Sequence, residues 1–322
     1  MKKPKRSISE WANRLIVPLY KKQFIQTLWN AEKQKNRDQG WVTKGELWVP
    51  WFLNMRPLGS SAETFLEVSQ AMADLTIGHD IDMYVAVEMA GINISGGTAI
   101  ASKWLNGLPC PIGYTRPLPK KVREPMKALQ LIRDIDSGAF KLRQEEFKAS
   151  VAILLRRCEN AGILDDETIK ALAVLKNHDL GDSDYGQKEF VEGRLINEQK
   201  VGILDDMAMN IGSKLIARLI ILWEARKRGV SVECNNAFYF LNRTATNRQT
   251  GFDYALETER DLYPAPIHLY YVIEMDEELP KLESVMCSEE FRVITDFQNN
   301  SDQFQDEDVQ KEVLALAKKA RK

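Results

Sequence analysis

Cysteine is scarce in this sequence, and its four residues lie so far apart that none forms a closely spaced pair. This spacing argues against a zinc site and against a disulfide framework, and it favours a reducing environment. Long apolar runs are also missing, and the basic N-terminus is followed by Ser7-Ile8-Ser9-Glu10-Trp11, where a signal peptide would be apolar. We therefore expect a cytoplasmic protein without membrane contact.

Neither sign of charge is in excess, because 44 basic and 46 acidic side chains leave a formal net charge of -2. A nearly neutral chain gives no reason to expect a polyanionic partner. The two ends are locally basic, at residues 2–6 and 318–322, and we expect solvated tails there, with nucleic-acid contact as the alternative. The 322 residues, 44% of them hydrophobic and 28% charged, suit a globular chain of one large or two ordinary domains.

The pattern that organises the chain lies at residues 201–213, where a short apolar run ends on the adjacent carboxylates Asp205 and Asp206. A loop of small or uncharged residues follows, and the apolar stretch 214–223 then begins a helix. In an open α/β sheet ligands collect at the carboxyl ends of strands, and a helix N-terminus suits a phosphate. The two acids can accept hydrogen bonds from sugar hydroxyls, and the N–H groups of residues 207–213 can surround a phosphate. The alternative is that both acids only cap the helix.

The same order of strand, loop and helix occurs earlier, with a buried strand at residues 82–87, a loop at 88–92 and a helix at 95–105. The apolar content of other segments predicts further strands, at residues 108–116, 230–242 and 267–273. This alternation predicts an α/β fold, an open sheet of parallel strands with helices on both faces.

The N-terminal region predicts a helix and a hairpin that together form a small hood. Residues 9–34 carry apolar side chains at helical spacing, with Pro18 expected to bend or break the helix. Residues 41–52 have the pattern of two strands joined by a tight turn at Lys44 and Gly45.

Two helical regions are expected on either side of the first strand and loop. Ser60 or Ser61 is expected to cap a helix that runs to Ala73, with Glu63 as the capping-box partner. Residues 122–177 carry periodic apolar positions that predict about three helices.

The C-terminal tail carries an amphipathic helix, at about residues 306–319, which can dock on the core or on a partner. We expect the chain to divide into five parts. These are an N-terminal helix and hood at 1–60, the first part of the α/β core at 61–121, a helical insert at 122–185, the second part of the core at 186–285, and a tail at 286–322.

Taken in order, these segments resemble the type I phosphoribosyltransferases, and among them orotate phosphoribosyltransferase most closely. The resemblance covers about residues 41–280, apart from the helical insert. Residues 201–213 look like the motif that binds phosphoribosyl pyrophosphate (PRPP), and residues 88–92 look like the pyrophosphate loop. Residues 52–56 are similar to the run that precedes the family's first core helix, and residues 114–116 and 190–193 are similar to the two ends of its catalytic loop. Residues 242–256 resemble the family's Asp-Arg, Gly-Gly, Leu stretch.

The resemblance implies a site for PRPP and Mg²⁺, in which Asp205 and Asp206 hold the ribose hydroxyls. It implies a 5′-phosphate site made by Ala208, Met209, Asn210, Ile211, Gly212 and Ser213. It implies a pyrophosphate site made by Glu88, Met89, Ala90 and Gly91 with Arg116, Lys120 or Lys121, and a substrate-facing lysine on the hood, Lys44. Mg²⁺ would be held mainly by PRPP, and together with the cations it would stabilise the negative charge that develops on the leaving pyrophosphate.

Two departures from the family pattern leave the function open. Met209, Asn210 and Ile211 stand where the family usually has Thr and Gly, so hydroxyl donors are lost and a branched side chain replaces a glycine. The helical insert replaces the catalytic loop, and its one histidine, His178, is expected to be solvent-exposed or a helix cap.

We therefore hold two hypotheses for the function. The first is an enzyme of nucleotide metabolism, a phosphoribosyltransferase that moves a phosphoribosyl group between PRPP and a nitrogenous base. The second is a catalytically weak or silent nucleotide-binding module, or an effector of the defence or toxin type, controlled by protein partners through residues 122–185. The resemblance also implies a homodimer.

Overall fold

The computed structural model describes residues 5–32, 38–43, 47–87, 90–107, 110–115, 191–208, 212–246 and 266–321. Within these ranges the centre of the molecule is one six-stranded sheet with the order β10-β9-β8-β5-β6-β7. Its strands are β5 (Met83–Ala86), β6 (Ile112–Thr115), β7 (Val191–Glu192), β8 (Gln199–Ala208), β9 (Val232–Asn242) and β10 (His268–Glu274). Every neighbouring pair is parallel except β6 and β7. The predicted open parallel sheet is confirmed, with one short antiparallel edge strand.

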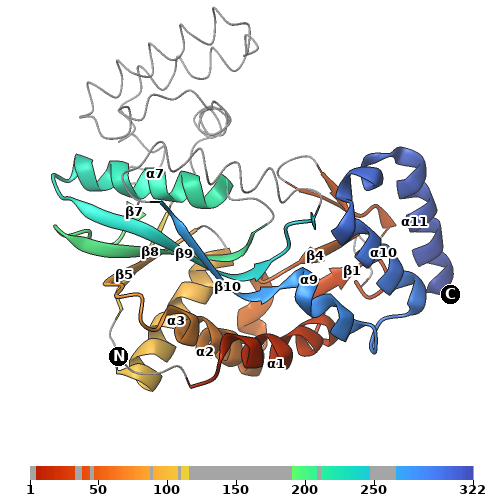
Figure 1. The fold of residues 1–322 in the computed structure, drawn as a ribbon, viewed down its shortest axis with the longest axis horizontal. Coiled ribbons are helices and arrows are strands. Elements are labelled where there is room, and N and C mark those ends of the chain that lie inside the picture. Colours follow the sequence, from red (N-terminus) through yellow and green to blue (C-terminus); the bar gives the residue numbers. More distant parts are fainter. Residues whose placement is uncertain are drawn as a thin grey trace, which may run out of the picture.

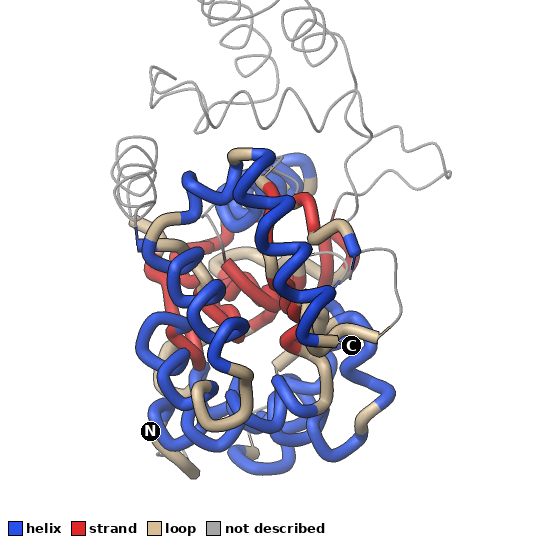
Figure 2. The backbone as a smooth tube through the Cα atoms, turned by 90° about the vertical axis from the view of Figure 1, so that its right-hand side faces the viewer, coloured by secondary structure: helices blue, strands red, loops and turns tan. Residues whose placement is uncertain are grey.

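Helices cover both faces of this sheet, as the alternation of strands and helices predicts (Figure 1). One face packs against α7 (Gly212–Lys227), and the other packs against α1 (Ile8–Lys21), α2 (Ala62–Thr76) and α3 (Ala90–Asn106). In Figure 2 the strands lie in the interior with helices outside them. Among the described helices, none combines the length and the apolar character needed to cross a membrane.

The N-terminal helix is shorter than its apolar periodicity predicts. A capping box between Ser7 and Glu10 begins α1, and the helix continues past Pro18 to end at Lys21. The backbone then turns through a positive φ of 59° at Gln23, and β1 (Ile25–Thr27) follows. The expected helix over residues 9–34 is therefore wrong beyond Lys21, because the later apolar side chains pack in a strand of the hood.

The hood consists of two small antiparallel pairs. β2 (Trp41–Val42) pairs with β3 (Trp48–Val49), as the predicted hairpin requires, and β4 (Trp51–Leu53) pairs with β1. Gly40 has φ +74°, and a Cβ there would lie 2.4 Å from the Trp48 indole nitrogen, so this turn requires glycine. The hairpin turn itself, with Lys44, lies outside the described residues.

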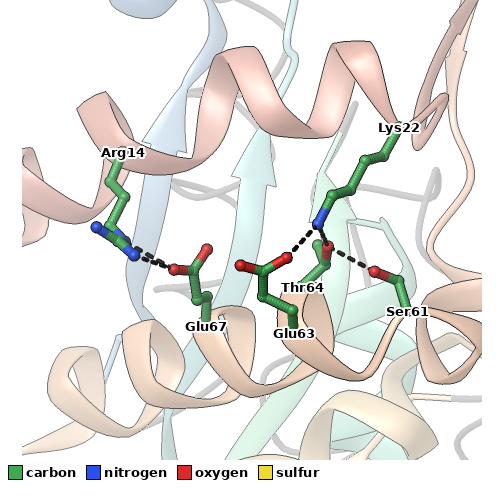
Figure 3. Close-up of polar contacts among 6 residues, drawn as sticks. All are labelled: Arg14, Lys22, Ser61, Glu63, Thr64 and Glu67. Carbon is green, nitrogen blue, oxygen red and sulfur yellow. Dashed lines mark hydrogen bonds and ion pairs between the residues drawn. The ribbon is translucent and has the colours of Figure 1, made fainter.

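The expected capping box of α2 does not form, and Figure 3 shows the reason. Ser60 belongs to a preceding turn, η2 (Arg56–Ser60), and Ser61 is the N-cap but makes no side-chain bond to the helix backbone. The Glu63 carboxylate instead accepts Lys22 Nζ from α1 at 3.0 Å, and Glu67 pairs with Arg14 one turn later. With Ser61 as the N-cap, the capping-box position belongs to Thr64 and not to Glu63, and the Ser61 and Thr64 hydroxyls bond to each other at 2.8 Å.

The C-terminal region contains more helix than the sequence pattern predicts. The expected final helix is present as α11 (Glu307–Ala320), but it is preceded by α9 (Met275–Glu278), η5 (Leu279–Leu282), α10 (Ser288–Asn299) and η6 (Ser301–Gln305). The Gln305 side chain bonds to the backbone N–H and carbonyl of Trp48, at 2.9 and 3.1 Å, and so fastens η6 to the hood. The expected insert at residues 122–185 lies outside the described residues, and the predicted five-part division stays a prediction.

Candidate functional site

The two adjacent acids lie in the carboxyl-terminal half of β8, next to the middle of the sheet. β8 continues to Ala208, so Ala208 belongs to the strand and not to the expected loop. Asp205 is opposite Tyr239 of the parallel strand β9, and Val87, just after β5, donates its N–H to Leu204 at 2.8 Å. Both neighbouring strands thus support the position of the acids.

The Asp205 side chain is buried, with 6% of the residue exposed, and it is held by internal partners. Its Oδ2 atom lies 2.7 Å from Lys214 Nζ and accepts the Ser213 hydroxyl at 3.3 Å. Its Oδ1 atom accepts the backbone N–H of Asp206 at 2.9 Å. Two of these partners come from the first turn of α7, so Asp205 fastens that helix to the strand.

Asp206 differs from its neighbour, because it has no salt bridge in the described part of the chain and remains partly exposed. Burial raises the pKa of its carboxyl well above the ordinary value, and the nearby Asp205 raises it further. Lys214 opposes this rise only in part. A carboxyl with a raised pKa and no salt bridge among the described residues is a candidate for contact with a ligand.

The N-termini of two long helices converge on the acids from opposite faces of the sheet. α7 begins at Gly212, directly after the loop that follows β8, and α3 begins at Ala90, after the loop that follows β5. A Cβ built on Gly91 would lie 2.8 Å from the Leu204 carbonyl oxygen and 3.4 Å from Asp205 Cα. Glycine therefore lets α3 begin directly against β8, so that two helix N-termini, a place that favours anions, lie beside the acids.

A buried arginine that was not among the predicted site residues follows the neighbouring strand. The Arg243 backbone N–H donates to the Ala208 carbonyl at 2.8 Å, and its guanidinium carbon lies 4.4 Å from the centre of the Trp51 ring. None of its three side-chain nitrogens has a hydrogen-bond partner within the described ranges, although only 1% of the residue is exposed. Burial lowers its pKa to about 9, so the guanidinium is still charged at neutral pH.

The backbone around Arg243 is fixed by polar contacts with the C-terminal elements. Asn242 donates to Glu274 Oε2 at 2.8 Å and accepts the Thr244 hydroxyl at 2.9 Å. The Gln298 amide from α10 donates to the Thr244 carbonyl at 3.0 Å. The position of Arg243 therefore depends on a helix, α10, that lies far along the chain.

The structure thus brings together Asp205, Asp206, Ser213, Ala208 and Gly91 of the predicted residues. The backbones of Ala90 and Gly212 also lie at this edge, as the first residues of α3 and α7. The other predicted site residues lie outside the described ranges, and their roles stay predictions: Lys44, Glu88, Met89, Arg116, Lys120, Lys121, Met209, Asn210 and Ile211.

The described side chains do not form a metal site by themselves. Within the described ranges, no group of three or more histidine, cysteine, aspartate or glutamate residues has the spacing to hold a metal ion. Mg²⁺ commonly uses one or two carboxylates together with substrate phosphates. Asp206, which has no salt bridge among the described residues, fits that limited role.

The order of the sheet and the helices on both faces define the fold class, an α/β fold with an open, mostly parallel sheet. The structure is similar to Leishmania donovani UMP synthase, with a TM-score of 0.51 and 13% sequence identity over 91% of this chain and 42% of that chain. It is also similar to orotate phosphoribosyltransferase from Aeropyrum pernix, with a TM-score of 0.45 and 14% identity over 83% of this chain and 97% of that chain.

At these identities the similarity shows the fold, and function must be argued from the site. The chain spans 42% of the length of the UMP synthase that it matches. By sequence, the chain matches no family model and no curated protein.

Proposed function

We propose that this protein binds PRPP at the carboxyl end of β8 and transfers the phosphoribosyl group to or from a nitrogenous base. The proposal rests on one observation: the N-termini of α3 and α7 both lie beside the acid pair at the carboxyl end of β8. A compound with a phosphate at one end, a pyrophosphate at the other and hydroxyls between them matches this arrangement of N–H donors and carboxylate.

Each part of the site has a role in this proposal. The N-terminus of α7 receives the 5′-phosphate, the N-terminus of α3 faces the pyrophosphate, and Asp206 accepts the ribose hydroxyls. Mg²⁺, when bound through PRPP oxygens, supplies positive charge that stabilises the leaving pyrophosphate. Both helix dipoles add partial positive charge on the sides where phosphate oxygens would lie.

Arg243 supports a substrate with an acidic or carbonyl oxygen on its base. The guanidinium is buried and charged, and within the described ranges it has no hydrogen-bond partner. A buried guanidinium without hydrogen bonds is costly; a carboxylate on a ligand would accept two parallel hydrogen bonds from it, and a carbonyl oxygen would accept one. We therefore propose an acceptor of this chemical class.

A second candidate function is nucleotide binding without efficient turnover. It is favoured by the internal contacts of Asp205 with Lys214 and Ser213, which leave these side chains less able to contact a substrate. Met209, Asn210 and Ile211, which depart from the family pattern in the phosphate loop, also favour binding without efficient turnover. A homodimer, a protein partner bound through residues 122–185, and a cytoplasmic role in nucleotide metabolism remain predictions that accompany either function.

Release of pyrophosphate separates the two candidates. The protein is incubated with PRPP, Mg²⁺ and a panel of bases with and without acidic oxygens, and pyrophosphate is measured. The enzyme hypothesis predicts release that depends on a base, and strongest release with a base that carries an acidic oxygen. PRPP binding without release from any base would favour the binding module instead.

A further inference from the structure

Lys214 is a buried lysine in the first turn of α7, with only 1% of the residue exposed. Its ammonium lies 2.7 Å from Asp205 Oδ2, donates to the Ser213 hydroxyl at 3.2 Å, and donates to the Met207 carbonyl. A lysine ammonium has three N–H donors, so these contacts use all of them. Its charge also lies 5.2 Å from the centre of the Tyr239 ring.

The partners of Lys214 are satisfied within the same network. Asp205 accepts from Lys214 and Ser213 on one oxygen and from the Asp206 N–H on the other. Ser213 has one hydroxyl donor, and it is used on Asp205. The three side chains therefore have no hydrogen-bond donor left for a ligand.

Electrostatics make this network difficult to open. A cation at a helix N-terminus is repelled by the helix dipole, so Lys214 needs the Asp205 carboxylate as compensation. If a ribose hydroxyl displaced the ammonium, a neutral group would replace a charged one, and two buried charges would lose their counter-ions. A sugar phosphate therefore binds at lower cost when the pair stays intact.

We propose that Lys214 is the resident counter-ion of Asp205, that their pair positions the first turn of α7, and that Asp206 alone of the two acids contacts the ligand. This inference rests on the proposed function and gives different roles to two acids that the sequence pattern treats as equivalent. Asp205 and Lys214 are positioning residues, because they hold the N–H groups of α7 where a phosphate would bind. Asp206 is the acid with no salt bridge in the described ranges.

The test is a double-mutant cycle read by thermal unfolding and by calorimetric titration with PRPP and Mg²⁺. Asp205→Asn and Lys214→Met, each alone, should lower the Tm by about 5 to 10 °C, because each leaves one buried charge unpaired. Each should also weaken PRPP binding about tenfold through displacement of α7. The double variant should recover a Tm within about 3 °C and a Kd within about threefold of wild type, since neither charge remains.

Asp206→Asn is the matched comparison in the same experiment. It should weaken PRPP binding by at least about thirtyfold without lowering the Tm, because it removes a carboxylate that carries a desolvation cost. A double variant that binds PRPP as weakly as Asp206→Asn would overturn the inference, because Asp205 would then contact the ligand. Additive losses of Tm in the double variant would also overturn it.

The proposed function can fail separately from this inference. If the wild-type protein binds no PRPP, the proposed function is wrong. The thermal unfolding measurements of the cycle still test whether Lys214 is the counter-ion of Asp205. Recovery of Tm in the double variant would then support Lys214 as the resident counter-ion of Asp205, and additive losses would refute it.

Discussion

At the scale of single residues, the burial of Arg243 costs stability, and we propose that the same side chain contacts the ligand. Its guanidinium is fully buried without a hydrogen-bond partner among the described residues, beside the Trp51 ring at 4.4 Å, and the charge of Asp206 opposes the effect of burial on its pKa only in part. A desolvated cation–π contact contributes about 2 kcal/mol, whereas burying an unpaired ion costs several kcal/mol. Burial of this side chain therefore costs stability, and an acidic oxygen on a ligand would offset that cost.

Replacing Arg243 by methionine should therefore raise the stability of the protein. Methionine keeps contact with Trp51 and removes the buried charge, so the free energy of unfolding should rise by about 1 to 3 kcal/mol. Urea denaturation measures this change, and Arg292→Met, at an exposed position on α10, is the control. A loss of stability in Arg243→Met would contradict the account, because it would mean that the guanidinium is satisfied in the free protein.

The sequence predicts the positions of Asp205, Asp206 and Ser213, but not the burial of Lys214 and Arg243 near them. Asp205 and Asp206 follow an apolar run, and that local signal is enough to place them at the carboxyl end of a strand. Lys214 and Arg243 also stand beside apolar runs, but a surface position is the ordinary expectation for a lysine or an arginine. Their burial depends on neighbours from α7, β9 and the hood, which only the tertiary structure brings together.

At the scale of elements, the helix α10 is joined to the N-terminal region by a buried carboxylate. Glu290 accepts the Tyr20 hydroxyl at 2.9 and 2.8 Å on its two oxygens, and it accepts the Thr27 hydroxyl at 2.5 Å. Burial raises the pKa of Glu290 above its ordinary value of 4.5, and the bonds from Thr27 and Tyr20 oppose the rise only in part. The contact between α10, α1 and β1 therefore depends on pH.

The sign of this dependence follows from the raised pKa. Between the unfolded value of about 4.5 and the higher folded value, the folded state binds more protons than the unfolded state, so stability falls as pH rises. Glu290→Gln does not titrate, and it should match wild type near pH 4.5 and exceed its stability by about 1 kcal/mol at pH 7.5. Urea denaturation at the two pH values measures this, with Glu289→Gln, at an exposed position, as control.

A Glu290→Gln variant that is less stable than wild type at pH 7.5 would contradict this interpretation. It would mean that the ionised carboxylate gains more from Tyr20 and Thr27 than it loses by burial.

Elements were predicted best where local pattern and tertiary contacts agree. The parallel strands and the final helix α11 have strong periodicity, and the structure confirms them. The end of α1 could not be predicted, because a strand pairing overrides the local signal. The capping box is missing because Ser60 lies in η2 and α2 begins after Ser61, which places Thr64 where the box requires Glu63. The helix α10 was missed because its sequence is largely polar, and its few buried side chains pack on segments distant in sequence.

At the scale of the whole molecule, one cluster of buried apolar side chains joins the hood, the sheet and the C-terminal helices. It includes Trp11 from α1, Trp51 from the hood, Phe238 from β9 and Phe297 from α10. The hood and the C-terminal helices therefore share a core with the sheet that carries the acids. This continuity holds Arg243, which directly follows β9, against Trp51 of the hood.

The central claim is that a ribose phosphate binds at the carboxyl end of β8, and calorimetric titration with PRPP and Mg²⁺ tests it most directly. Wild-type protein and Asp206→Asn are compared, with Asp82→Asn, an exposed acid just before β5 at the opposite edge of the sheet, as control. We predict binding by wild type and by Asp82→Asn, and a loss of affinity of at least about thirtyfold in Asp206→Asn. Equal affinity in all three proteins, or binding in none, would contradict the claim.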